Sequence, residues 1–233
     1  MTWRHSIVIL STVVLTAVLP APTGASEDET KRVEAATSVL GELMSIPEQG
    51  IPASLLKDAY GVVVIPGVIK VGFGIGGRRG HGVMVVREKR RWSRLIFVTI
   101  TGGSIGWQIG AQSTDIILVL KSKRSVDGIL DGKFTLGADA AVAAGPVGRQ
   151  AEAGTDIKLK AEIYSYSRSR GLFAGLSLEG AKLSIKKDAN ASFYGTDELN
   201  ARGIIKSGKL KTPAVGRAFV KALEHYVKAV RKG

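Results

Sequence analysis

The most informative stretch of this chain runs Ser169-Arg170-Gly171-Leu172-Phe173-Ala174-Gly175-Leu176-Ser177-Leu178-Glu179-Gly180-Ala181. It is apolar and punctuated by glycine, and it carries no residue typical of a catalytic centre. Glu179-Gly180 favours a turn, which predicts a hairpin between Leu172–Leu178 and Ala181–Ile185. Alternation in the second arm predicts which side chains face the core, namely Ala181, Leu183 and Ile185.

More β-structure is expected on the N-terminal side of this stretch. From Ile157 to Tyr164 apolar and polar residues alternate, which predicts a strand with one buried and one exposed face. Apolar runs predict further strands, at 62–65, 83–86, 95–101 and 116–120. Pro66-Gly67 is expected to form a turn or bend, and the charged segment 87–94 a hairpin loop.

Helices are predicted at both ends of this β-rich region. Apolar residues recur at helical spacing from Glu27 to Ile46 and again after Pro213. The 29 glycines fall mainly at 61–82, 102–110 and 128–148, where they permit tight bends and close backbone approach. We therefore expect an α+β fold with a strongly curved, glycine-rich antiparallel sheet or partly closed barrel, flanked by N- and C-terminal amphipathic helices.

The stretch from Ser169 to Ala181 resembles the "SRGLFAGVSLEG" signature of the SYLF domain family. Other matching blocks follow the family's order and spacing from about Lys31 to about Lys211: Gly61–Gly77, Thr135-Leu136-Gly137, Ala144–Arg149 and Phe193-Tyr194-Gly195. SYLF domains are lipid-binding modules of eukaryotic endocytic and actin-associated proteins and of secreted bacterial proteins. The resemblance implies lipid binding without catalysis; in eukaryotic relatives the lipids are phosphoinositides, and some members bind actin.

The N-terminus has the layout of a secretory signal peptide over residues 1–25. Arg4 and His5 precede an apolar run, Ile7–Leu19, and small residues end at Ala25. The alternative is a membrane anchor, but a spanning helix needs about 20 apolar residues. This interpretation predicts an exported protein, periplasmic or secreted after cleavage near Ala25, with residues 26–233 forming a single SYLF-like domain.

The charge of the chain indicates a polyanionic partner. Lys and Arg number 33 against 20 Asp and Glu, a formal net charge of +13. Export argues against nucleic acid and favours anionic phospholipids such as phosphatidic acid, phosphatidylglycerol or cardiolipin at a peripheral membrane surface. The alternatives are a cell-envelope structural or interaction protein that binds peptidoglycan, lipopolysaccharide or a protein partner, and a charge that only confers solubility.

Two sequence motifs match a nucleotide-binding and a hydrolase pattern, but neither is followed by the helix that its chemistry requires. Glycines 72, 74 and 77 fit G-x-G-x-x-G, but the sequence that follows does not favour a helix. Gly102–Gly106 fits the G-x-S-x-G pattern around Ser104, with Asp115 and His225 in hydrolase order, and again no helix is expected. Without cysteine or H-E-x-x-H, zinc is not expected. We expect no catalytic residue, no metal and no cofactor.

Basic residues near the signature stretch are the candidate headgroup-binding site. Lys158 and Lys160 project from one face of one predicted strand, and Lys182 and Lys186 from one face of another. Lys187 adds a further amine nearby. Arg168 and Arg170 lie in the loop that enters the signature stretch, and their planar guanidinium groups suit phosphate.

The N-terminal helix is a second membrane candidate, implied by the role of this segment in eukaryotic relatives. The residues concerned are Lys31, Arg32, Val33, Leu40 and Leu43. The same periodicity is typical of packing on the domain's own core, and the three acids at 27–29 would repel an anionic membrane.

Overall fold

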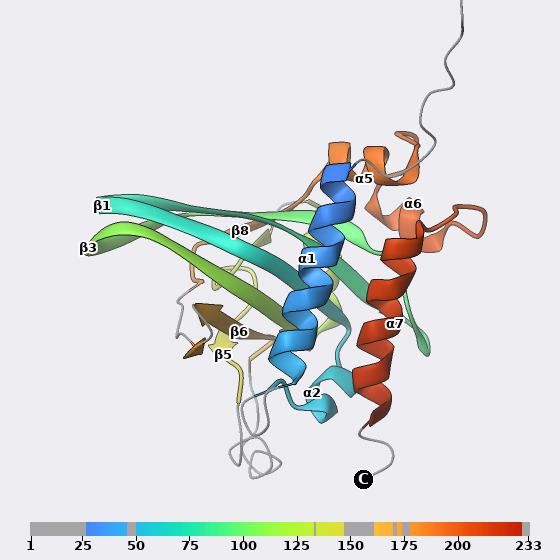
Figure 1. Cartoon of the computed structure of the whole chain (residues 1–233), viewed down its shortest axis with the longest axis horizontal. Coiled ribbons are helices and arrows are strands. Elements are labelled where there is room, and N and C mark those ends of the chain that lie inside the picture. The colour runs from blue at the N-terminus through green and yellow to red at the C-terminus, as the bar shows by residue number, and fades with distance from the viewer. Residues whose placement is uncertain are drawn as a thin grey trace, which may run out of the picture.

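A computed structural model describes most of the chain, over residues 27–45, 50–132, 134–146, 161–169, 172–173 and 178–229. It shows an α+β fold in which a strongly curled sheet forms a half-barrel (Figure 1). Two long helices, α1 (Glu27–Met44) and α7 (Ala214–Ala229), cover one face of this sheet (Figure 1). The predicted terminal helices and curved sheet are therefore confirmed.

The sheet has the strand order β2-β1-β3-β6-β5, with β8 beside β3, β4 beside β8 and β7 beside β6. Its strands are β1 (Gly61–Glu88), β2 (Arg91–Trp92), β3 (Ile96–Leu120), β4 (Phe134–Thr135), β5 (Val142–Ala144), β6 (Ile163–Ser169), β7 (Leu172–Phe173) and β8 (Lys182–Ile185). The pairing is antiparallel except between β5 and β6, which are parallel. The sheet is therefore mixed rather than purely antiparallel.

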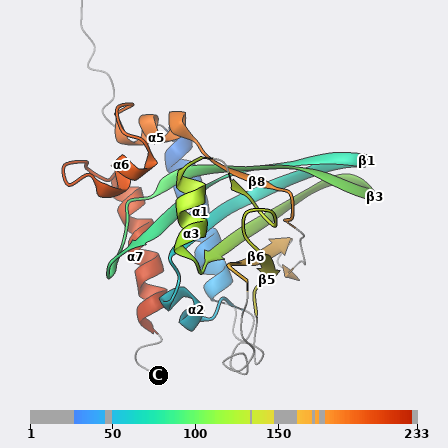
Figure 2. The ribbon, with the colours of Figure 1, turned by 180° about the vertical axis from the view of Figure 1, so that it is seen from behind.

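The shorter helices lie around the sheet and the long helices. They are α2 (Ala53–Lys57), α3 (Lys123–Leu130), α5 (Lys187–Tyr194) and α6 (Ala201–Lys206). α3 lies behind the sheet when it is viewed from the α1 side (Figure 2). No helix among the described residues is long and apolar enough to cross a bilayer.

β1 and β3 pair along nearly their whole length and extend beyond the helices as an arm (Figures 1 and 2). The predicted strands at 62–65 and 83–86 are two parts of β1, because Pro66-Gly67 forms a register shift and not a turn. β1 folds back on itself, so that Gly82 faces Val64. A Cβ added to Gly82 would lie 2.1 Å from the Val64 carbonyl oxygen, so glycine alone permits this approach.

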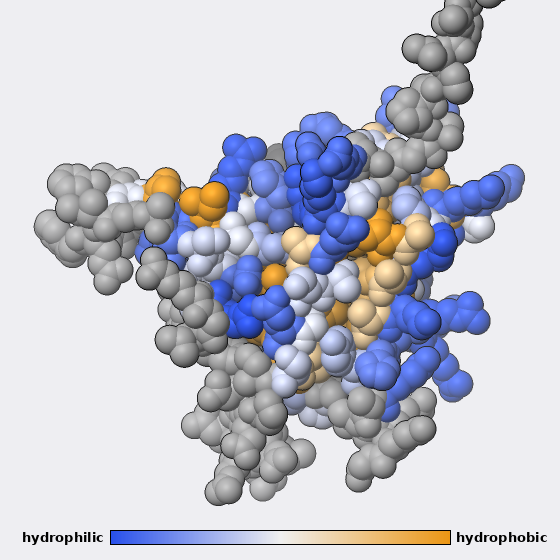
Figure 3. Space-filling view, in the orientation of Figure 1, coloured by the Kyte–Doolittle hydropathy of each residue, from blue (hydrophilic) through white to orange (hydrophobic). Residues whose placement is uncertain are grey.

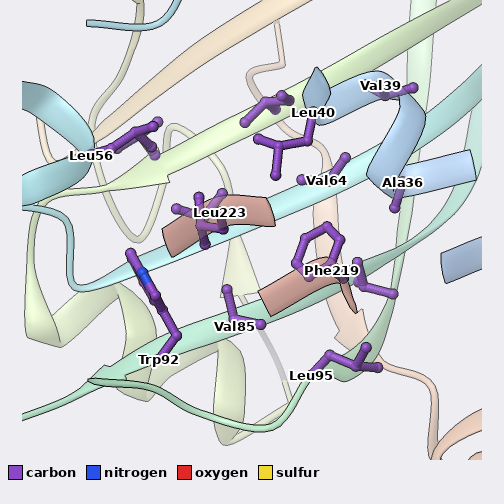
Figure 4. Close-up of a cluster of buried hydrophobic side chains, with 14 of the residues drawn as sticks. Ala36, Val39, Leu40, Leu56, Val64, Val85, Trp92, Leu95, Phe219 and Leu223 are labelled. Atoms are coloured by element: carbon purple, nitrogen blue, oxygen red, sulfur yellow. The ribbon is translucent and has the colours of Figure 1, made fainter. Parts of the chain in front are cut away.

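The sheet carries a hydrophobic cluster on each face. Under α1 and α7, Phe219 and Leu223 pack with Leu40 and with strand residues such as Val64 and Val85 (Figure 4). The opposite cluster combines alternate strand residues with α3 and α6, and its members include Ile65, Met84, Ile100, Leu118, Ile129 and Ile204. The two-residue period of the strands thus divides their side chains between two buried layers.

The half-buried strand predicted from Ile157 to Tyr164 overlaps β6 only at Ile163 and Tyr164, and its residues 157–160 lie outside the described residues. Ile163 belongs to one hydrophobic cluster and Tyr164 to the other, and both are almost fully buried. Ala161, predicted to share a face with Ile163, packs against the cluster of Tyr164 instead, so the predicted alternation does not hold there, and a second layer covers the face expected to be exposed.

The hairpin predicted across Glu179-Gly180 is not formed by the described residues, although the turn is. Gly180 has φ 75°, and the Ala181 N–H donates to the Leu178 carbonyl at 3.0 Å. β7 pairs with β6, whereas β8 pairs with β3 and β4. Ala181 and Leu183 are buried as predicted, because β3 supplies the neighbour that the hairpin arm was expected to supply.

Candidate functional site

The apolar face of α1 lies in the protein core. Val33, Leu40 and Leu43 are fully buried against the sheet and α7. Their insertion into a membrane would require α1 to leave the sheet and expose that cluster. The packing of this helix therefore favours the core interpretation of its periodicity.

The basic residues of α1 lie at the edge of the covered region. Lys31 forms an ion pair with Glu27 at 2.5 Å, and Arg32 lies 3.7 Å from Glu29. The Arg32 guanidinium also lies 5.9 Å from the centre of the Phe97 ring. Phe97 is buried in the cluster beneath the helices, so Arg32 marks the boundary between the hydrophobic core and the uncovered sheet.

Beyond this boundary the same sheet face is open and basic. The strand register places Arg79 of β1 opposite Thr101 of β3, which is in turn opposite Lys182 of β8. Directly opposed residues share a sheet face, so these three exposed side chains form one row across three strands. Two strand spacings of about 4.8 Å separate Arg79 from Lys182.

The neighbouring row lies closer to α1. His81 of β1 opposes Thr99, which opposes Ser184 of β8, and the His81 Nδ1 atom lies 3.1 Å from Thr99 Oγ1. Burial lowers the pKa of His81, and the positive charges of Arg32, Arg79 and Lys186 lower it further. The positive charges of residues on α1, on β1 and at the end of β8 therefore all influence His81 on this face.

A groove of about 700 Å³ lies between α1 and β1 next to these rows. Its basic lining residues come from both elements, and they are Lys31, Arg32, Arg78 and Arg79. Asp28 is the acidic residue of the lining, and His81 lies at one side. The positive charges outnumber the negative one, so the groove suits an anionic ligand.

Two aliphatic side chains beside the groove are exposed. Ile69 and Val71 are 53% and 50% accessible, and both line the groove from the arm. They are two residues apart in β1 and so share a face. Figure 3 shows exposed apolar surface on the arm with hydrophilic surface beside it. Exposed apolar residues bordered by charge are typical of membrane or protein contact sites.

We call this surface the basic groove, and define it by Lys31, Arg32, Ile69, Val71, Arg78, Arg79, Lys182 and Lys186. The structure thus brings together four predicted residues, two from each of two candidate sites that were considered separate. Sequence reasoning missed the two β1 arginines and the two aliphatic residues. Arg78-Arg79 was a visible signal, but it was used only to argue against a helix.

Arg168 is engaged inside the protein. Its guanidinium pairs with Glu42 of α1 and lies 3.9 Å from Asp115 of β3, and the side chain is 16% exposed. Asp115 also accepts a hydrogen bond from the Gly67 N–H at 2.9 Å. Arg168 therefore joins α1 to the sheet, and its pairing with two carboxylates opposes a role in headgroup binding.

The remaining predicted basic residues do not join the groove. Lys187 begins α5 and lines a different cleft that contains Asp188 and Glu198. Lys158, Lys160 and Arg170 lie outside the described residues.

The residues weighed for catalysis lie in an unsuitable context. Ser104 falls within β3, which continues to Leu120, whereas a nucleophile elbow requires a turn into a helix. The glycines of the G-x-G-x-x-G match lie within β1. His225 is exposed on α7. The described part of the chain contains no group of three or more His, Asp or Glu residues that could hold a metal.

Comparison with known proteins identifies the relatives of the chain. Residues 101–226 match the family model Ysc84, described as "Las17-binding protein actin regulator". The chain is 34% identical to SH3 domain-containing YSC84-like protein 1 of Xenopus laevis, over 89% of this chain and 62% of the relative. It is 36% identical to SH3 domain-containing protein PJ696.02 of Schizosaccharomyces pombe, over 92% and 50%. Identity to Protein YSC84 of Saccharomyces cerevisiae is 37%, over 76% and 38%.

The prediction of an exported, periplasmic or secreted protein is wrong. These relatives are eukaryotic SH3 domain-containing or YSC84-like proteins, and their family is described as actin regulators. Such relatives give no support to a signal peptide or to a location in a bacterial envelope. The alternatives of peptidoglycan or lipopolysaccharide binding depended on export, so they are not supported either. The error arose because a short apolar run such as Ile7–Leu19 is a compositional pattern without a specific destination.

The match covers most of this chain but less of its relatives. The chain spans 38% to 62% of the length of the three relatives named above. The resemblance drawn from the glycine-rich signature is confirmed by this independent comparison. The chain belongs to the Ysc84 family of SYLF-domain proteins.

Proposed function

We propose that this domain binds anionic phospholipid membranes, without catalysis, through the basic groove. The observation that carries the proposal is the placement of Arg79 and Lys182 in one exposed row beside the exposed residues Ile69 and Val71. Phosphate oxygens of a headgroup would accept hydrogen bonds from the guanidinium groups and pair with the lysine amines. The two aliphatic side chains would contact the boundary of the acyl chains.

The charge of the groove makes this binding strong enough to measure. Each basic residue near an anionic leaflet contributes about 1 kcal/mol, and the effect weakens with salt. The basic groove as defined above contains six basic residues, of which Lys31 and Arg32 also contact acids of their own helix and Lys186 pairs with Asp188. Helix α1 would remain packed on the sheet throughout, because its apolar residues belong to the core.

The test is co-sedimentation with vesicles of phosphatidylcholine alone or mixed with phosphatidylserine, over a salt series. We expect binding to the anionic vesicles that weakens as salt rises. The double variant Arg79→Glu/Lys182→Glu should reduce it at least tenfold. A matched control, Lys206→Glu/Lys209→Glu, changes the net charge equally at exposed residues at the end of α6 and after it, and α6 lies away from the arm (Figure 1). Equal loss in both variants would show that net charge, and not the groove, determines binding.

The apolar part of the proposal needs its own variant. Ile69→Ser/Val71→Ser keeps the charge and removes exposed aliphatic surface, so the fold should tolerate it. We expect weaker vesicle binding. The loss of affinity in this variant should depend less on salt than the loss in the charge-reversal variant. Unchanged binding would restrict the site to electrostatic contact.

A protein partner is a second proposed function at the level of the family. The family description names Las17 binding and actin regulation, and one relative is named "LAS seventeen-binding protein 3". The chain spans 39% of that relative, so the partners of the whole relative come to this chain only as a proposal.

A further inference from the structure

A second basic cleft lies where the two ends of β1 come together, away from the arm that the middle of β1 forms. Its volume is about 920 Å³, and its walls come from α2, from the turn between β1 and β2, and from α7. Six basic residues line it: Lys57, Arg87, Lys89, Arg90, Arg91 and Lys228. Asp58 and Glu224 oppose them, which leaves an excess of four positive charges. None of these residues belongs to the basic groove.

The floor of the cleft is a stacked Arg–Trp pair. The Arg87 guanidinium lies 3.9 Å from the centre of the Trp92 ring. The same guanidinium donates to the Leu56 carbonyl at 2.9 Å and to the Lys57 carbonyl at 3.2 Å. These bonds fix Arg87 against the end of α2, so the floor is rigid before any ligand binds.

Trp92 retains an unused hydrogen-bond donor. Its side chain is 7% exposed, and its buried Nε1 atom has no hydrogen-bond partner among the described residues. A buried N–H group without an acceptor destabilises the free protein. A ligand oxygen that reached it after a small shift of the cleft wall would remove that penalty.

The rim of the cleft carries an aromatic residue and a strained lysine. Tyr60 is 47% exposed, although its backbone is held between β1 and β3 by hydrogen bonds of 2.8 Å. Lys89 has φ 56°, and it is the one residue other than glycine with a positive φ in the described ranges. Glycine or asparagine would relieve that strain at the same turn. Strained residues of this kind concentrate at functional sites.

We propose that this cleft binds an acidic peptide segment of a partner protein. Tyr, Trp and Arg are the residues that dominate protein–protein contacts, and all three line this cleft. The excess positive charge selects acidic residues, and the exposed ring of Tyr60 offers apolar surface to an aromatic or aliphatic residue. A flat bilayer reaches such a recess less well than a flexible chain does. This inference does not depend on membrane binding by the basic groove.

The test is fluorescence anisotropy with a labelled octapeptide of Asp and Glu containing one central Phe. The comparison peptide replaces the acids with Asn and Gln. We expect binding of the acidic peptide alone, and a change in Trp92 emission that is absent in Trp92→Phe. The variant Arg90→Glu/Arg91→Glu alters two exposed residues and should weaken binding at least tenfold. Lys206→Glu/Lys209→Glu is the charge-matched control and should bind normally.

Two further variants make the outcome decisive. Tyr60→Ala should weaken peptide binding about three- to tenfold, and Lys89→Gly should weaken it while slowing unfolding. Equal loss in Arg90→Glu/Arg91→Glu and the control would overturn the proposal, as would equal binding of the neutral peptide. Loss of vesicle binding in Arg90→Glu/Arg91→Glu, with peptide binding unchanged, would assign the cleft to membranes instead.

Discussion

One face of the sheet serves two purposes along the same strands. Beneath α1 and α7 it carries Val64, Val85 and Phe97, which are buried with Phe219 of α7. Beyond the edge of the helices, the same face carries the row of Arg79, Thr101 and Lys182, which is exposed. Strand alternation is unchanged across the boundary. What differs is whether a helix lies above the strand.

This difference shows how one sheet can carry an exposed basic surface, proposed above to bind lipid, without loss of the core. The helix-covered half provides stability through buried apolar area, which needs no particular charge. The open half carries the proposed binding residues, which can be basic because no helix of the described residues covers them. Substitutions in the two halves should therefore separate stability from binding, and the following predictions test that separation.

The largest expected effect concerns the covered half. Phe219→Ala removes a fully buried ring and should lower the free energy of unfolding by about 3–5 kcal/mol. Thr101→Ala, on the open half of the same face, should change it by less than about 0.5 kcal/mol. Urea denaturation of both variants measures the difference. Similar losses would show that the open half is also part of the packed structure.

The fold-back of β1 predicts the next largest effect. A Cβ at Gly82 would meet the Val64 carbonyl oxygen, so Gly82→Ala should destabilise the fold by about 2–3 kcal/mol. Gly103→Ala is the matched control, because a Cβ there meets nothing within 4 Å. It should be neutral or slightly stabilising in the same denaturation experiment. A tolerant Gly82 would mean that the two halves of β1 are not held this closely.

Arg168 and Lys182 sharpen the contrast between a structural and a binding cation. Arg168→Ala breaks contacts with Glu42 and Asp115 and should cost about 1–2 kcal/mol of stability, with vesicle binding unchanged. Lys182→Ala should leave stability unchanged and weaken vesicle binding roughly fivefold, equivalent to about 1 kcal/mol. Denaturation and co-sedimentation of both variants decide the assignment, and reversed results would exchange the two roles.

The smallest effect is a pH dependence at the boundary between the two halves. The pKa of His81 lies below its ordinary 6.5 through burial and the charges of Arg32, Arg79 and Lys186. The unfolded chain therefore binds a proton first as pH falls through about 6.5, so folding stability declines below that pH. His81→Gln should remove about 0.5 kcal/mol or less of this decline, because solvent screens the site. Urea midpoints at pH 7.5 and 5.5 would measure it; an identical decline in the variant would place the titration elsewhere.

Much of the fold was predictable because periodicity reports burial directly. The spacing of Val33, Leu40 and Leu43 predicted an amphipathic helix but left core packing and membrane contact open, whereas the alternation at Ala181 and Leu183 predicted their burial. The short helices α5 and α6 were missed, since each spans at most eight residues and carries little periodic signal. The pairing of β8 was also missed, because a local turn does not specify which distant strand lies alongside.

The candidate site was less predictable than the fold. Net charge, which follows from residue types alone, indicated an anionic ligand, and the resemblance of the glycine-rich signature indicated a SYLF domain. Which cations share a surface depends on contacts between residues far apart in the chain. Arg79 and Lys182 meet through Thr101 of β3, and Arg168 is withdrawn by Glu42 of α1. Resemblance to a known signature indicated the family, and local period determined the main element types and many of the core faces. Strand register and helix coverage are long-range properties, so the tertiary structure alone decided where the basic groove lies.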